Sequence, residues 1–121
     1  MSDDLGRLAS DLHTVAVKST AVCRAVVQKG ALNIKNDWRA RWTGKRYLPA
    51  LANSITFDTE ITPFGVEAEI GPDKSRPQGP LANLIEYGSV NNAPDPGGAP
   101  ALDAEAPRFE KALADGIERL L

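Results

Sequence analysis

Four acidic residues alternate with other residues along two neighbouring segments and form the densest set of groups able to do chemistry: Asp58, Glu60, Glu67 and Glu69. Carboxylates that converge in a shielded place can hold a divalent cation or act as a general acid and base. Alternation with a period of two instead places them together on the outer face of strands. We therefore expect a solvated strand face, which would also suit an acidic docking surface.

His13 is the only histidine and Cys23 the only cysteine. His13 has no second ligand near it in sequence, and Cys23 falls in an apolar stripe, where a free cysteine behaves as a small hydrophobe. A single cysteine excludes an internal disulfide and a cysteine-based zinc site. Because no nucleophile, base or metal-ligand set converges, we expect neither an enzyme nor a cofactor.

The segment 38–47, Trp-Arg-Ala-Arg-Trp-Thr-Gly-Lys-Arg-Tyr, interleaves basic and aromatic residues. Such a pattern can hold phosphates and stack on bases. It is also typical of a helix terminus whose cations complement the dipole and whose tryptophans pack in the core. Under either interpretation, the side chains to examine are Arg39, Arg41, Lys45 and Arg46.

These groups sit at the end of a predicted helix over 3–40. Ser2 is a good N-cap, and apolar residues recur at steps of three and four in a stripe roughly 160° wide. A helix of this length extends roughly 50 Å, which is long for so small a domain, so part of the stripe should need a partner chain. Gly30 in the middle of the stripe indicates either a close approach of another backbone or a kink.

The rest of the sequence predicts shorter elements of secondary structure. Alternation on both sides of Thr62-Pro63-Phe64-Gly65 indicates a β-hairpin over 54–70, with Ile55 and Phe57 facing inward. A short helix is expected over 80–87, ended by Gly88. The C-terminal helix spans 100–120, and Pro107 either breaks it or starts a second segment. Segments 71–79 and 89–99 are rich in Pro and Gly, and we expect 71–79 to be mobile and 89–99 to be an extended loop. The fold class is α+β: a long N-terminal helix packed on a small antiparallel sheet, with two further helices.

The 121 residues predict a single domain of ordinary globular composition, 42% hydrophobic and 25% charged. No apolar run approaches the ~20 residues that cross a bilayer, and the acidic N-terminus is unlike a signal peptide, so we expect folding in a cytoplasm and no membrane contact. Net charge is −2, yet residues 14–46 carry eight Lys/Arg against one acid and residues 47–121 carry five against twelve. This asymmetry indicates contact either with nucleic acid or between the basic face of one copy and the acidic face of another.

A set of short motifs follows the same order as a known family. They are Gly-Ala-Leu-Asn-Ile-Lys at 30–35, Leu-Pro to Ser-Ile at 48–55, Ile-Glu-Tyr-Gly-Ser at 85–89 and Pro-Ala-Leu-Asp at 100–103. With the long helix and the hairpin, they resemble the small tail-component proteins of long, non-contractile tailed phages, known as tail-completion, neck or head-to-tail joining proteins. The chain departs from that family at Pro96-Gly97-Gly98-Ala99, where a bulky segment is usual, so we expect weaker packing and more flexibility there.

The resemblance implies a non-enzymatic virion subunit that forms a ring between the head connector and the tail tube, around the passing DNA. It favours a hexamer over a dodecamer, with the connector or stopper and the tail-terminator or tube proteins as neighbours. Segments 71–79 and 89–99 would become ordered on assembly and hold adjoining rings. Predicted assembly contacts are Glu86, Tyr87, Pro100 and Leu102. The alternatives are a tail-terminator ring or, in a different class, a small nucleic-acid-binding regulator.

Overall fold

The computed structural model describes residues 2–45, 48–63 and 65–121, and their side chains except those of residues 2–4 and 11–17. It contains a long helix α1 (Ser2–Trp42), the strands β1 (Ile55–Thr62) and β2 (Gly65–Pro72), a short helix α2 (Ala82–Tyr87) and a C-terminal helix α3 (Gly98–Glu118). Two 3₁₀ turns, η1 (Ala52–Ser54) and η2 (Gly79–Leu81), precede β1 and α2. The predicted α+β class and order of elements are confirmed.

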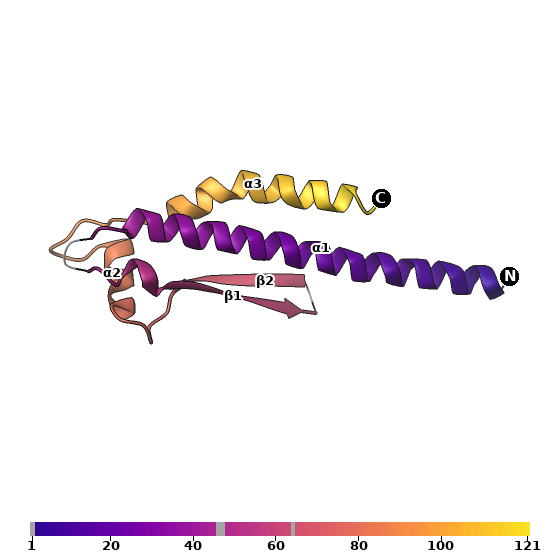
Figure 1. Ribbon diagram of the computed structural model, residues 1–121, viewed down its shortest axis with the longest axis horizontal. Coiled ribbons are helices and arrows are strands. Elements are labelled where there is room, and N and C mark those ends of the chain that lie inside the picture. The colour runs from indigo at the N-terminus through magenta and orange to yellow at the C-terminus, as the bar shows by residue number, and fades with distance from the viewer. Residues whose placement is uncertain (1, 46–47, 64) are drawn as a thin grey trace.

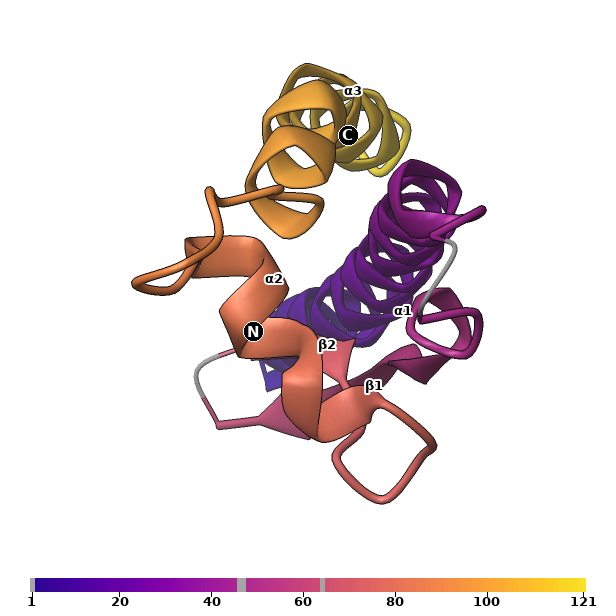
Figure 2. The same cartoon turned by 90° about the vertical axis from the view of Figure 1, so that its left-hand side faces the viewer.

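The molecule is elongated along α1. The hairpin and α3 lie on different sides of this helix, and α2 with its connections gathers at the C-terminal end of α1 (Figures 1 and 2). The N-terminal part of α1 continues beyond both the hairpin and the end of α3 (Figure 1). None of the described helices combines the length and the apolar character needed to span a membrane.

Helix α1 is slightly longer than the predicted 3–40 and is uninterrupted. Gly30 is buried, and a Cβ atom there would lie 3.1 Å from the ring Cδ2 of Phe109 on α3. The glycine therefore makes room for an aromatic side chain of another helix, whereas the sequence predicts either a close backbone or a kink, and α1 continues through it.

The hairpin pairs its strands from Ile55 opposite Pro72 to Thr62 opposite Gly65, which confirms the predicted 54–70. Its inner face covers α1. Ile55 is fully buried, the Lys35 ammonium lies 5.6 Å from the centre of the Phe57 ring, and Gln28 donates a 3.5 Å hydrogen bond to Thr59.

Helix α2 ends at Gly88, whose φ of 81° is accessible to glycine at little cost. Helix α3 runs through Pro107 without ending, so both predictions for this proline are wrong. A proline inside a helix loses one hydrogen bond and clashes with the carbonyl four residues earlier. Packing of α3 along α1, with Phe109 against Gly30, stabilises the helix despite that cost.

The buried core lies at the α2 end of the molecule and combines Trp42, Leu51, Ala52, Ile55 and Ala82. The neighbouring loops are tied to it. In segment 71–79, the Asp73 N–H donates to the Ser54 carbonyl at 2.7 Å, and in segment 89–99 the Asp95 N–H donates to the Ile85 carbonyl at 2.8 Å. Both segments thus form hydrogen bonds within one chain. The predicted mobility of 71–79 stays a prediction.

Candidate assembly site

Two tryptophans one helical turn apart lie at the C-terminal end of α1. The rings of Trp38 and Trp42 meet edge to face, with centroids 5.6 Å apart and planes at 76°. Trp42 is 1% exposed, and its indole N–H donates a 3.0 Å hydrogen bond to the Asp95 carbonyl. The interpretation in which these tryptophans pack in the core is confirmed, so Trp42 offers no free face for stacking on a base.

The segment before α3 packs directly on this tryptophan pair. A Cβ atom on Gly97 would lie 2.6 Å from Trp38 Cδ1, and one on Gly98 would lie 2.7 Å from Trp38 Cη2. The expectation of weak packing is therefore wrong for Gly97 and Gly98. Only glycine fits at these two positions, because the indole ring of Trp38 occupies the space that a side chain would fill.

Glu86 fastens the start of α3 to α2. Its buried carboxylate accepts hydrogen bonds from the backbone N–H groups of Gly97, Gly98 and Ala99, at 2.7, 3.1 and 3.2 Å. The first N–H groups of a helix have no partner within the helix, and the helix dipole favours an anion there. The two motifs Ile85–Ser89 and Pro100–Asp103 are thus joined by one side chain.

The described members of the basic segment are bonded within the chain. Arg39 donates from Nε to the Ile55 carbonyl at 2.8 Å. Arg41 pairs with Asp37 one turn earlier at 3.0 Å, and Lys45 pairs with Asp95. Arg46 lies outside the described residues. Contact of these groups with DNA or a neighbouring subunit stays a prediction, and the structure shows that Arg39 already fastens the hairpin to α1.

The predicted assembly contacts differ in exposure. Tyr87 is 77% exposed and Leu102 is 56% exposed, whereas Pro100 is half-buried. Glu86 is buried and occupied by the start of α3. Of this set, Tyr87 and Leu102 present the most free surface to another chain.

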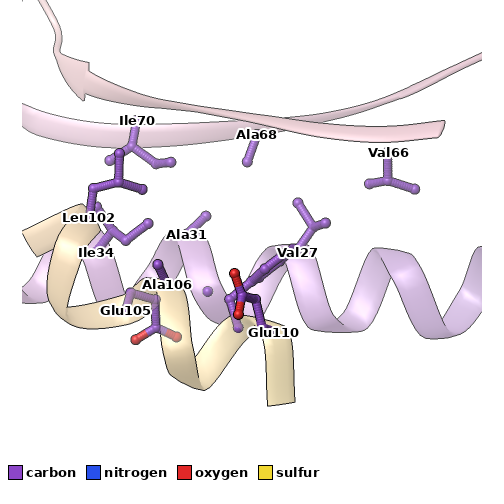
Figure 3. A pocket seen from close by; sticks show the side chains of 12 residues that line it. Val27, Ala31, Ile34, Val66, Ala68, Ile70, Leu102, Glu105, Ala106 and Glu110 are labelled. Atoms are coloured by element: carbon purple, nitrogen blue, oxygen red, sulfur yellow. The ribbon is translucent and has the colours of Figure 1, made fainter. Parts of the chain in front are cut away.

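An open apolar groove lies between β2 and α3, with α1 as its floor (Figure 3). Its volume is about 380 Å³. Figure 3 shows Val66, Ala68 and Ile70 of β2 on one side, and Leu102 and Ala106 of α3 on the other. Glu105 and Glu110 add carboxylates to the α3 wall, and Glu105 accepts a 3.0 Å hydrogen bond from Asn33. We call this the hairpin groove.

The four hairpin acids are all exposed on the outer face, as predicted. Asp58 lies opposite Glu69 and Glu60 opposite Glu67 in the strand register, so like charges face each other directly. Among the described residues, no group of three His, Cys, Asp or Glu side chains could hold a metal ion. Cys23 is half-buried in α1, and the side chain of His13 lies outside the described set.

Sequence reasoning missed the contact between the tryptophan pair and Gly97–Gly98, and it missed the hairpin groove. The four-residue spacing of Trp38 and Trp42 does indicate that both rings share one helix face. It does not indicate which distant segment covers that face.

Comparison with known protein families, with curated protein sequences and with solved structures finds no match to this chain.

Proposed function

We propose that this protein is a structural subunit of a phage neck, which completes the tail and joins it to the head connector as a ring around the DNA channel. The placement in the neck comes from the resemblance of its ordered motifs to tail-completion proteins. What the structure contributes is support for an assembly role, through surfaces that the single chain leaves uncovered.

The observation that carries the proposal is the N-terminal arm, by which we mean residues 2–17 of α1. At about 1.5 Å per residue, the 41-residue helix is about 60 Å long. Leu5 and Leu8 in the arm are 67% and 55% exposed, although they belong to the same apolar stripe that packs on the hairpin and α3 further along. A helix of this kind is favourable when another chain covers its stripe.

The hairpin groove is a second uncovered apolar surface. Large apolar patches on soluble proteins mark interaction sites, and here the patch is concave and lined by β-branched and aromatic side chains such as Val27, Ile34 and Phe109. In the proposed ring, this groove receives an apolar segment of an adjoining neck or tail protein.

The distribution of charge agrees with contacts between unlike surfaces. The acidic outer face of the hairpin and the basic middle of α1 lie in one molecule, so copies arranged head to tail would bring them together. Heterologous contacts of this type close into a ring when the rotation between copies permits. The resemblance favours six copies.

A nucleic-acid-binding regulator is the rival from a different class. It would use residues 38–47, but the three described cations there are bonded within the chain and both tryptophans pack inward. A regulator should bind DNA at sub-micromolar protein concentration, seen as a salt-dependent shift of DNA mobility in a gel, and should form no ring.

The test is a phage whose copy of this gene carries an early stop codon, with the wild-type gene supplied from a plasmid as the control. We expect filled heads and separate tails in electron micrographs, and attached tails after complementation. A tail-terminator would instead give tails of irregular length. Normal, infectious particles without the protein would overturn the proposal.

A further inference from the structure

A second groove lies between α1 and the C-terminal half of α3, and we call it the α1–α3 groove. Val22 and Val26 of α1 line it together with Leu120, which follows the end of α3, and its volume is about 470 Å³. Gly116 lies at its base, where a Cβ atom would be 2.6 Å from a methyl group of Val22. The two helices therefore approach closely at Gly116 and leave an apolar trough above.

We propose that the α1–α3 groove of one copy binds the N-terminal arm of a second copy. This inference rests on the proposed self-assembly and names the surfaces that carry it. The arm offers the exposed Leu5 and Leu8 to the apolar trough. Helix-in-groove docking of an amphipathic helix is a common mode of recognition.

Charge selects this occupant. The arm contains Asp3, Asp4 and Asp11 against the single cation Arg7. The groove carries Lys29 and Arg119 on its rim beside one acid, Asp115. Within the described side chains, neither Lys29 nor Arg119 takes part in an ion pair. Both cations are exposed and available to a partner.

The same argument excludes the hairpin groove as the site for the arm. Its wall carries the exposed carboxylate of Glu110 (Figure 3), beside the buried Glu105, which is paired with Arg108. The outer face of the adjacent hairpin is acidic. An arm with a surplus of Asp would meet like charges there, and juxtaposed like charges disfavour a wrong contact. The rim of the α1–α3 groove instead carries two cations, Lys29 and Arg119.

The contact must form between molecules. The arm and one wall of the α1–α3 groove belong to the same uninterrupted helix, so the arm of a chain cannot fold back into its own groove (Figure 1). A second copy can supply the arm, and repeating that step from copy to copy gives the heterologous contact that a ring requires.

The experiment measures self-association of the purified full chain by sedimentation velocity over a range of concentrations. The test variant is K29E/R119E, which reverses the groove rim. We expect its dissociation constant to rise at least about tenfold, because attraction becomes repulsion. The matched control is K74E/K111E, which makes the same change in net charge outside this groove and should leave association unchanged.

A charge swap adds the decisive comparison. Reversing the arm with D3K/D4K/D11K should also weaken association, and mixing the two variants should restore it, because each supplies the surface that the other needs. Far-UV circular dichroism checks that every variant keeps its helix content.

If K29E/R119E associated as tightly as the wild type, the inference would be overturned, and the proposed assembly role would be unaffected. A wild-type chain that stays monomeric at every concentration would also overturn it, since this contact needs only identical copies. That result would leave a ring formed on the particle unaffected. A reciprocal dimer that K29E/R119E abolishes would support arm docking while counting against a ring built by it.

Discussion

At the scale of residues, the α2 end of the molecule depends on one carboxylate. Glu86 is removed from water and accepts hydrogen bonds from three backbone N–H groups at the start of α3. Hydrogen bonds to a charged group are about twice as strong as neutral ones, and an unpaired buried partner is costly. The side chain that the resemblance suggested as an assembly contact therefore has a structural role within the chain.

Glu86→Ala should lower the free energy of unfolding by about 2 kcal/mol or more, because buried N–H groups lose their acceptor. Urea denaturation followed by tryptophan fluorescence measures this directly, since Trp38 and Trp42 lie beside Gly97, one of the residues that donate to Glu86. Glu110→Ala is the control, because it removes an exposed carboxylate from α3. Equal stabilities for wild type and Glu86→Ala would contradict this structural role of Glu86.

Gly97→Ala should destabilise the fold by about 1–3 kcal/mol, the usual cost of overpacking. The added methyl would lie 2.6 Å from the Trp38 ring, which must move with its partner Trp42. Gly6→Ala is the matched change in open space, since nothing lies within 4 Å of a Cβ there. It should be neutral or add up to about 1 kcal/mol of helix stability. Thermal unfolding of both variants tests the contrast.

Asp73 should make a pH-dependent contribution to stability. The Ser75 hydroxyl and backbone N–H, with a smaller effect of Arg76, hold the pKa of this carboxyl below its usual value. When the pKa of a carboxyl is lower in the folded than in the unfolded state, the group stabilises the fold at pH values above the unfolded pKa. This stabilisation is lost as the pH falls through the folded-state pKa. The stability difference between wild type and Asp73→Asn should therefore be full at neutral pH and vanish in acid. A difference that grows on acidification would contradict this assignment.

At the scale of elements, the hairpin carries a local conflict. Two pairs of carboxylates face each other directly on its outer face, and like charges in such positions destabilise a sheet. The inner face compensates through Ile55, Phe57 and Ile70, which pack on α1 or the core.

Glu69→Lys should stabilise the hairpin by about 0.5–1 kcal/mol, because a cation would then face Asp58. Urea denaturation at low salt measures the gain. At about 1 M salt, where the Debye length is about 3 Å, most of the gain should disappear. A gain of equal size at both salt concentrations would show that packing, rather than charge, is responsible.

The elements themselves were accessible from the sequence because each has a local cause. The apolar spacing predicts α1, alternation around Thr62–Gly65 predicts the hairpin, and Gly88 predicts the end of α2. The Pro107 and Gly97–Gly98 predictions failed because their outcome depends on distant residues. Pro107 is tolerated because α3 packs on α1, and the two glycines are ordered by the tryptophans. The candidate site was found only in part for the same reason, since grooves arise where elements from different parts of the chain meet.

At the scale of the whole molecule, stability should fall along α1. Residues near Trp42 are held by the core, and residues near Gly30 by α3 and the hairpin. The N-terminal arm is covered by neither in Figure 1 and exposes Leu5 and Leu8. Most of the stability of a helix in a protein comes from packing of its apolar face, so the arm alone gains little from its own hydrogen bonds.

In the monomer, backbone amides of residues 5–10 should exchange with solvent deuterium far faster than those of residues 31–38, because the arm opens locally without unfolding the core. Mass spectrometry of peptides from the two regions measures the difference at low protein concentration. Raising the concentration until the chain associates should slow exchange in the arm and leave residues 31–38 unchanged, since of these two regions only the arm gains a partner. Slow exchange of the arm in the monomer would mean that its apolar stripe is already covered, and the case for an assembly subunit would lose its main support.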